Sequence, residues 1–97
     1  MLNCNLEGNR LALEGDLQVV FLERLHQALT QAFGQSEPLQ IDLSGITSVD
    51  TAGLQLLLAF ARSRHEAEST RFTEPPDFFK KALSLAGMNE HFAPFLD

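Results

Sequence analysis

The feature that most constrains the fold is one stretch, residues 39–64, in which a short strand pattern runs into a long helix pattern. Residues 39–43 alternate apolar and polar side chains, which is typical of a strand. Residues 44–49 are expected to form an irregular crossing, and residues 54–67 carry apolar side chains at helical spacing. A strand followed by a helix is the unit from which helix-covered parallel sheets are built.

Two shorter strand patterns precede this stretch, at residues 2–6 and 11–15. The turn-forming residues 7–9 lie between them, which predicts a β-hairpin. A helix pattern follows at residues 19–33, with leucines recurring on one face. We expect Asp16 to cap the start of this helix.

The last third of the chain predicts one more strand, at residues 70–73, and one more helix, at residues 78–86. Asp77 is placed to cap this helix and Gly87 to end it in the left-handed conformation. Gly34 is expected to end the first helix in the same way. Three apolar residues near the C-terminus should fold back onto the core: Met88, Phe92 and Phe95.

This order of elements predicts one α/β domain that spans residues 1–97. Strands separated by helices imply right-handed crossovers, so the small sheet should be mostly parallel. The hairpin adds an antiparallel N-terminal strand, and the helices pack against the sheet. Function in such folds tends to lie at the carboxyl ends of the strands, where loops lead into helix N-termini.

Composition excludes several classes of function. The chain has 97 residues with a net charge of −6, which disfavours binding to nucleic acid. The only cysteine, Cys4, allows no internal disulfide and no cysteine metal cluster. The longest apolar run, residues 56–61, is too short to span a bilayer. With no signal-peptide pattern at the start, we expect a cytoplasmic protein without membrane insertion.

The junction between the central strand and its helix is where the sequence places the function. Both Asp50 and Thr51 are side chains that cap helices. Gly53 in the first turn costs about 1 kcal/mol relative to alanine, which indicates a close approach by the sheet or by a partner. A phosphate on Thr51 would meet exposed N–H groups and the positive end of the helix dipole. The candidate partner-binding residues at this junction are Asp50, Thr51, Ala52 and Gly53.

The helix that begins here carries apolar side chains on two faces. One stripe should face the sheet: Leu54, Leu57, Leu58 and Ala61, with His65 continuing it. At about 100° per residue, Leu56 points nearly opposite this stripe. Because so small a domain cannot bury both faces, we expect an exposed patch that also binds the partner. That patch comprises Ala52, Leu56 and Ala59, with Phe60 beside them.

Nothing in the sequence indicates catalysis. The histidines His26, His65 and His91 are scattered without the spacing of metal ligands. The glycines Gly45 and Gly53 are too far apart for a phosphate loop, and no lysine follows either. We therefore expect no catalytic residue, no bound metal and no cofactor.

Taken together, these residues resemble the STAS domain family, which is named for sulfate transporters and anti-sigma-factor antagonists. The resemblance is carried by Ile41-Asp42-Leu43-Ser44-Gly45, by Val49-Asp50-Thr51-Ala52-Gly53-Leu54 and by the apolar helix that follows. The element order, the length and residues 83–88 also match, so the resemblance covers essentially the whole chain. It implies a non-enzymatic bacterial domain that binds a protein partner.

In anti-sigma-factor antagonists, a Ser or Thr directly after the Asp is phosphorylated by the kinase-like anti-sigma factor, and this position is Thr51 here. The resemblance implies that the unphosphorylated form binds the kinase and frees sigma, whereas the phosphorylated form lets go. Thr51 stands where serine is more typical, and Ala52 where a small polar residue is commoner.

Two alternatives share the same pattern. One is the small STAS subunit of the bacterial phospholipid-transport ABC system, in which the Thr supports binding to the transporter ATPase. The other is a STAS component of a chemotaxis-type signalling system.

Overall fold

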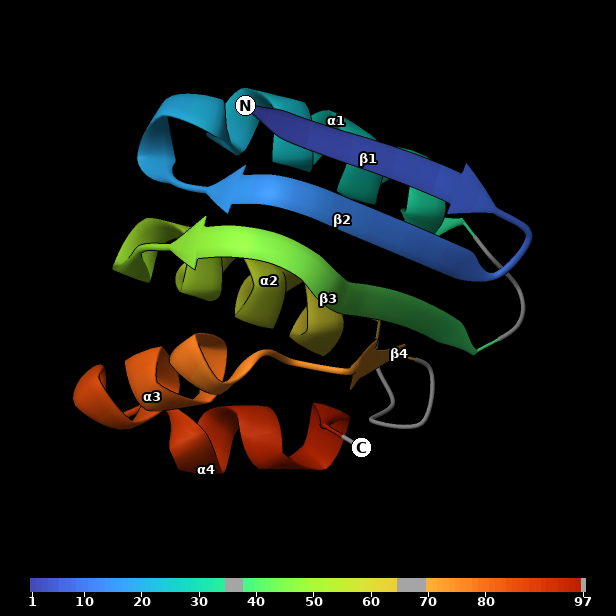
Figure 1. Cartoon of the computed structure of the whole chain (residues 1–97). Helices are drawn as coiled ribbons and strands as arrows, with labels where there is room; N and C mark the ends of the chain where they lie inside the picture. Colours follow the sequence, from blue (N-terminus) through green and yellow to red (C-terminus); the bar gives the residue numbers. More distant parts are fainter. Residues whose placement is uncertain (35–37, 65–69, 97) are drawn as a thin grey trace.

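The computed structural model describes residues 1–34, 38–64 and 70–96 and follows the predicted order of strands and helices (Figure 1). The strands are β1 (Leu2–Glu7), β2 (Arg10–Leu17), β3 (Leu39–Val49) and β4 (Thr70–Thr73). The α-helices are α1 (Leu22–Phe33), α2 (Thr51–Ser63), α3 (Asp77–Leu85) and α4 (Asn89–Phe92). Two short 3₁₀ turns are η1 (Val19–Phe21) and η3 (Ala93–Phe95).

The four strands form one mixed sheet in the order β1-β2-β3-β4. The hairpin strands β1 and β2 are antiparallel, whereas β2–β3 and β3–β4 are parallel. Helices α1 and α2 lie on the same face of the sheet, and α3 and α4 lie beyond β4 (Figure 1). The predicted fold class, a mostly parallel sheet with an antiparallel first strand, is confirmed.

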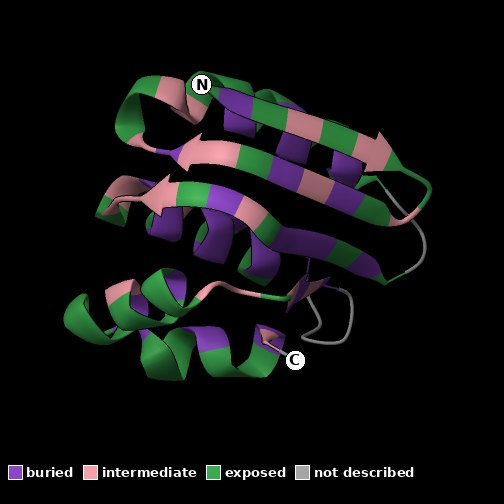
Figure 2. Cartoon of the chain, in the orientation of Figure 1, coloured by how far each residue is buried: buried purple, intermediate pink, exposed green. Residues whose placement is uncertain are grey.

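The core lies between the sheet and α1 and α2 (Figure 2). Alternate residues of the strands point toward the helices because successive side chains of a strand face opposite sides. Fully buried strand residues include Leu11, Leu13, Leu17, Leu39, Ile41 and Leu43. The helices meet them with Leu25, Leu29, Leu54 and Leu57. The last segment also reaches the core through Met88, Phe92 and Phe95, as predicted.

The prediction for the end of the central strand is wrong. Residues 44–49, expected as an irregular crossing, continue the strand to Val49. The irregularity is present as two shifts in the pairing with β2, each of which adds one residue on β3. These shifts lie between Ala12 and Glu14 and between Gly15 and Asp16. The bulged strand keeps Ile46 buried while it carries the chain to the start of α2.

The expected caps of the first helix are wrong. Asp16 lies within β2, where its carboxylate accepts a hydrogen bond from Ser48 of β3. The helical segment opens as η1 before α1 begins at Leu22. Gly34 has a φ of −81°, so it does not take the left-handed conformation. Helix α2 begins at Thr51, three residues earlier than predicted, and ends at Ser63. The predicted continuation to residue 67 lies outside the described residues.

The third helix, α3 (Asp77–Leu85), begins and ends one residue earlier than the predicted range 78–86, and its predicted cap is wrong. Asp77 is the first residue of α3 and makes no side-chain cap, because the extended Pro76 occupies the cap position. Gly87 follows α3 with a φ of +70°, so the predicted left-handed end is confirmed. The strand over Thr70–Thr73 matches its prediction at both ends.

Candidate functional site

Asp50 organises the junction between β3 and α2. Its backbone is extended, and its Oδ1 accepts a hydrogen bond of 2.9 Å from the N–H of Gly53, which makes it the predicted helix cap. Its Oδ2 accepts a second bond of 2.8 Å from the N–H of Val19 at the start of η1. One carboxylate therefore fixes both the α2 N-terminus and the connection that leaves β2.

Gly53, in the first turn of α2, is buried against the end of β2. A Cβ at this position would lie 2.5 Å from the carbonyl oxygen of Leu17. The same oxygen accepts a hydrogen bond of 3.0 Å from the N–H of Asp50. The close approach that the sequence indicated is thus an approach to the sheet, and it seats the helix N-terminus on the carboxyl end of β2.

Thr51, the first residue of α2, is exposed. Its hydroxyl makes no hydrogen bond within the described part of the chain, since Asp50 supplies the cap. Beside it is a hollow of about 230 Å³ between the start of α2 and the end of α3. This hollow is lined by Val49, Asp50, Thr51, Leu54, Ala82, Leu85 and Ala86.

Exposed apolar side chains lie on the elements that border the start of α2, and sequence reasoning missed them. Val19 and Val20 are 64% and 72% exposed in η1, and Leu85 is 82% exposed at the end of α3. The start of α2, η1 and the end of α3 lie at one edge of the molecule, on the left of Figure 1. The sequence does carry a signal of this exposure, because Val19 and Val20 are adjacent. Consecutive residues cannot share one helix face, so the pair cannot be buried together on one side of a helix. We call Thr51, Val19, Val20 and Leu85 the Thr51 edge.

The same edge holds a second carboxylate. Hydrogen bonds from the N-terminal ammonium of Met1, from Ser48 and from Thr47 lower the pKa of Asp16 to about 2. Asp16 pairs with Ser48 in the sheet, close to the point where β3 ends. The side chain is therefore ionised at neutral pH, and its charge is paired with the N-terminal ammonium of Met1 at 2.8 Å.

The first half of the motif, residues 41–45, holds two strands of the sheet together through Asp42. Asp42 is nearly buried on β3, where it accepts a hydrogen bond of 2.9 Å from the N–H of Ser44 and pairs with the Arg10 guanidinium of β2. Burial opposes its ionisation, yet the bond from Ser44 and the charge of Arg10 hold the pKa of Asp42 below its usual value. This pair ties β2 to β3 upstream of the Thr51 edge.

The outer face of α2 is less exposed than predicted. The expected inward stripe is confirmed, because Leu54, Leu57, Leu58 and Ala61 are all buried. On the opposite side Ala59 is exposed, and Ala52 and Leu56 are half-buried.

Phe60 is only 7% exposed, so its place in an exposed patch is wrong. Its ring packs edge-on against Phe33 of α1, with centroids 6.2 Å apart. His65, expected to continue the inward stripe, lies outside the described residues.

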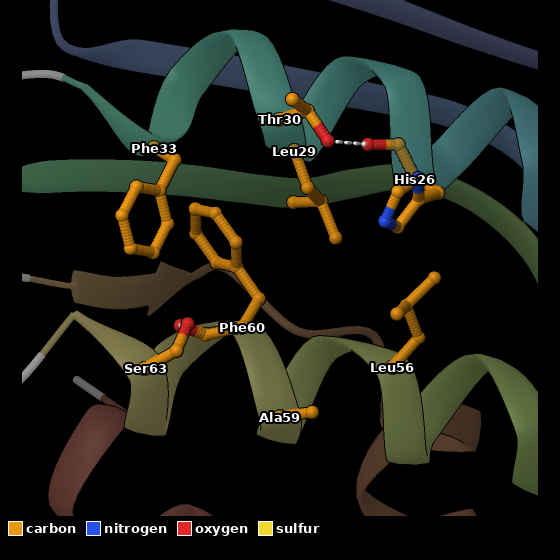
Figure 3. Close-up of a pocket in the computed structure, with 8 residues that line it drawn as sticks. All are labelled: His26, Leu29, Thr30, Phe33, Leu56, Ala59, Phe60 and Ser63. Atoms are coloured by element: carbon orange, nitrogen blue, oxygen red, sulfur yellow. Dashed lines mark hydrogen bonds between the residues drawn. The ribbon is translucent and has the colours of Figure 1, made fainter.

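The predicted patch therefore divides in two. Ala52 lies next to Thr51, whereas Leu56, Ala59 and Phe60 line a separate hollow between α1 and α2 (Figure 3). In the described ranges, no three His, Cys, Asp or Glu side chains come together as metal ligands. No helix among the same residues has the length and apolar character needed to cross a membrane.

The chain matches a solved structure and a family model. The chain superposes on the structure of the anti-sigma factor antagonist SpoIIAA in its unphosphorylated form, with a TM-score of 0.67 and 16% sequence identity. The match covers 100% of this chain and 86% of that one. The family model described as Mlab, STAS domain matches residues 2–96, so the chain belongs to the STAS domain family. No curated protein sequence matches it.

Proposed function

We propose that this protein is a non-enzymatic, cytoplasmic STAS regulator that binds a kinase-like partner through the Thr51 edge and is released when Thr51 is phosphorylated. The observation that carries the proposal is the exposed hydroxyl of Thr51 at the first position of α2. Because Asp50 caps the helix, the Thr51 hydroxyl has no structural task there. It is therefore open to a kinase without loss of the fold.

Phosphorylation would change the surface more than the structure. A phosphate adds about −1.5 to −2 charges at neutral pH and is stabilised by the N–H groups of a helix N-terminus. At this position it would lie beside the carboxylate of Asp50, at the edge of the molecule that also carries the exposed Val19, Val20 and Leu85. A partner that buries those apolar side chains would have to desolvate the phosphate, which strongly disfavours docking.

The docking surface that we propose comprises the Thr51 edge with Asp50 and Ala52, while Gly53 acts beneath it by seating the helix. The fold shared with an anti-sigma factor antagonist supports a kinase-like anti-sigma factor as the partner.

The description of the matching family model favours a second candidate. In that candidate the protein is the accessory subunit of a phospholipid-transport ABC system, and Thr51 contacts the transporter ATPase without being phosphorylated.

Three substitutions at one position separate the two candidates. Wild type, Thr51→Ser, Thr51→Ala and Thr51→Glu are each used to recover partners from host lysate, which are identified by mass spectrometry and then purified. A switch predicts that Ser and Ala keep the kinase-like partner and that Glu loses it. It also predicts phosphate transfer from ATP to the wild-type and Ser proteins but not to the Ala protein.

A contact residue predicts a different pattern. Ala and Glu would both weaken binding, the partner recovered would be a transporter ATPase, and no phosphate would be transferred. Gln31→Glu adds the same charge as Thr51→Glu at an exposed position of α1 and serves as the matched control. If Gln31→Glu weakened binding as much as Thr51→Glu, the effect would come from net charge and the proposed switch would be refuted.

A further inference from the structure

A hollow of about 410 Å³ lies between α1 and α2 and is distinct from the Thr51 edge (Figure 3). It is lined by His26, Leu29, Thr30 and Phe33 of α1 and by Leu56, Ala59, Phe60 and Ser63 of α2. Its volume falls within the range of about 300–1,000 Å³ that is usual for small-molecule sites. Several lining residues are exposed, so the hollow is open to solvent.

The walls of the hollow are apolar and aromatic. Leu29 and Leu56 point into it from opposite helices, and the rings of Phe33 and Phe60 meet across the gap at one end (Figure 3). These rings pack at 74° to each other. The small side chain of Ala59 leaves the space between the helices unfilled. A flat apolar group placed here would contact two aromatic rings and two leucines.

The polar groups around the hollow have few unused hydrogen-bonding positions. The Thr30 hydroxyl donates to the carbonyl oxygen of His26, and the Ser63 hydroxyl donates to that of Phe60, both at 2.8 Å. Both hydroxyl protons are thus engaged within their own helices. The His26 imidazole points toward the hollow and has no hydrogen-bond partner within the described ranges (Figure 3).

The lining also restricts the charge of a ligand. It contains no Asp, Glu, Lys or Arg, so a buried ionic group would have no fixed counter-charge. The net charge of −6 further disfavours an anion.

Shape restricts the ligand as well. The Phe33–Phe60 contact closes one end of the gap, which does not suit a helix about 10–12 Å across lying along the groove.

We propose that the hollow between α1 and α2 binds an uncharged aromatic small molecule that carries one hydroxyl or N–H group, with the rings against Phe33 and Phe60 and the polar group hydrogen-bonded to His26. The proposal is independent of Thr51 and its partner. It reassigns Leu56, Ala59 and Phe60 from a protein interface to a ligand site.

The first test uses 2-naphthol as the probe, followed by its fluorescence. The chain contains no Trp and no Tyr, so the protein contributes little emission of its own. Wild type should bind one equivalent saturably. Ala59→Leu, which fills the hollow from an exposed position, should weaken binding at least about ten-fold. Gln55→Leu adds a similar apolar group to an exposed position of α2 outside the lining and should leave the affinity unchanged.

The second test examines the polar part of the site. Naphthalene lacks the hydroxyl of 2-naphthol, so the ratio of the two affinities isolates the bond to His26. The ratio measured for wild type should fall several-fold in His26→Leu, through weaker 2-naphthol binding with little change for naphthalene. An unchanged ratio would refute the role assigned to His26.

Other outcomes would overturn the site itself. Non-saturable binding, or equal affinity in wild type and Ala59→Leu, would show that the probe does not occupy the hollow. Circular dichroism on each variant separates loss of binding from loss of folding. If wild type bound no probe and Ala59→Leu lost the protein partner while Gln55→Leu kept it, the hollow would belong to the protein interface instead.

Discussion

Gly53→Ala tests how the α2 N-terminus is seated on the sheet. The new Cβ would lie 2.5 Å from the Leu17 carbonyl oxygen and 3.2 Å from the Leu17 carbonyl carbon. Both atoms are backbone, so the strand or the helix must shift, and such overpacking costs about 1–3 kcal/mol. The shift also weakens the bond from the Asp50 N–H to the same oxygen, which contributes about 1 kcal/mol. Alanine's better helix propensity returns about 1 kcal/mol.

The net expectation is that Gly53→Ala lowers the free energy of unfolding by about 1–3 kcal/mol. Urea titration followed by circular dichroism measures this directly, and thermal melting should show a Tm lower by roughly 4–8 °C for each kcal/mol. Gly34→Ala is the matched control, because a Cβ there meets nothing within 4 Å and its φ suits any residue. That control should be neutral or stabilising by up to about 1 kcal/mol. A Gly53→Ala protein as stable as wild type would refute the close approach.

Substitutions at three further positions test other parts of the structure. Asp50→Ala removes both hydrogen bonds of the Asp50 carboxylate and should cost about 1–2 kcal/mol in urea unfolding, whereas Asp50→Asn should cost less. Arg64→Met keeps the buried stem but removes the bonds that Arg64 donates to the carbonyl oxygens of Ala32 and Phe33 at the end of α1; we expect a loss of about 1–3 kcal/mol. The folded-state pKa of Asp16, about 2, lies below its ordinary value, so its contribution is present above pH 4 and lost as the pH falls toward 2. Asp16→Asn should therefore flatten the acid limb of the stability profile, and an unchanged limb would contradict this role.

The sequence alone determined the order of the elements and most of the core. Hydrophobic period and turn residues are local signals, and for that reason the hairpin, the strand over Thr70–Thr73 and the inward stripe of α2 were predicted correctly. Asp50 was also predictable as a cap, because capping depends on a few adjacent residues. The motif indicates the STAS family from the sequence alone, and the match of the family model to residues 2–96 confirms it.

Interactions between distant segments could not be predicted in this way. The sequence could not tell whether Gly53 approaches the sheet or a partner, since the answer depends on Leu17, which is 36 positions away (53 − 17). The local sequence predicts Asp16 as a helix cap, but its carboxylate accepts a hydrogen bond from Ser48 of the neighbouring strand β3. Residues 44–49 belong to the sheet because two bulges let β3 remain paired with β2, and this pairing is not visible in the local sequence.

The two candidate sites differ in the same respect. The position of Thr51 at the start of a helix follows from the local sequence, because the strand, the capping residue and the periodic apolar residues of the helix are contiguous. The apolar surroundings of Thr51 come from η1 and α3, and the hollow at Phe60 exists because Phe33 of another helix meets it. Which side chains gather around a residue depends on how the elements pack, and only the tertiary structure decides that.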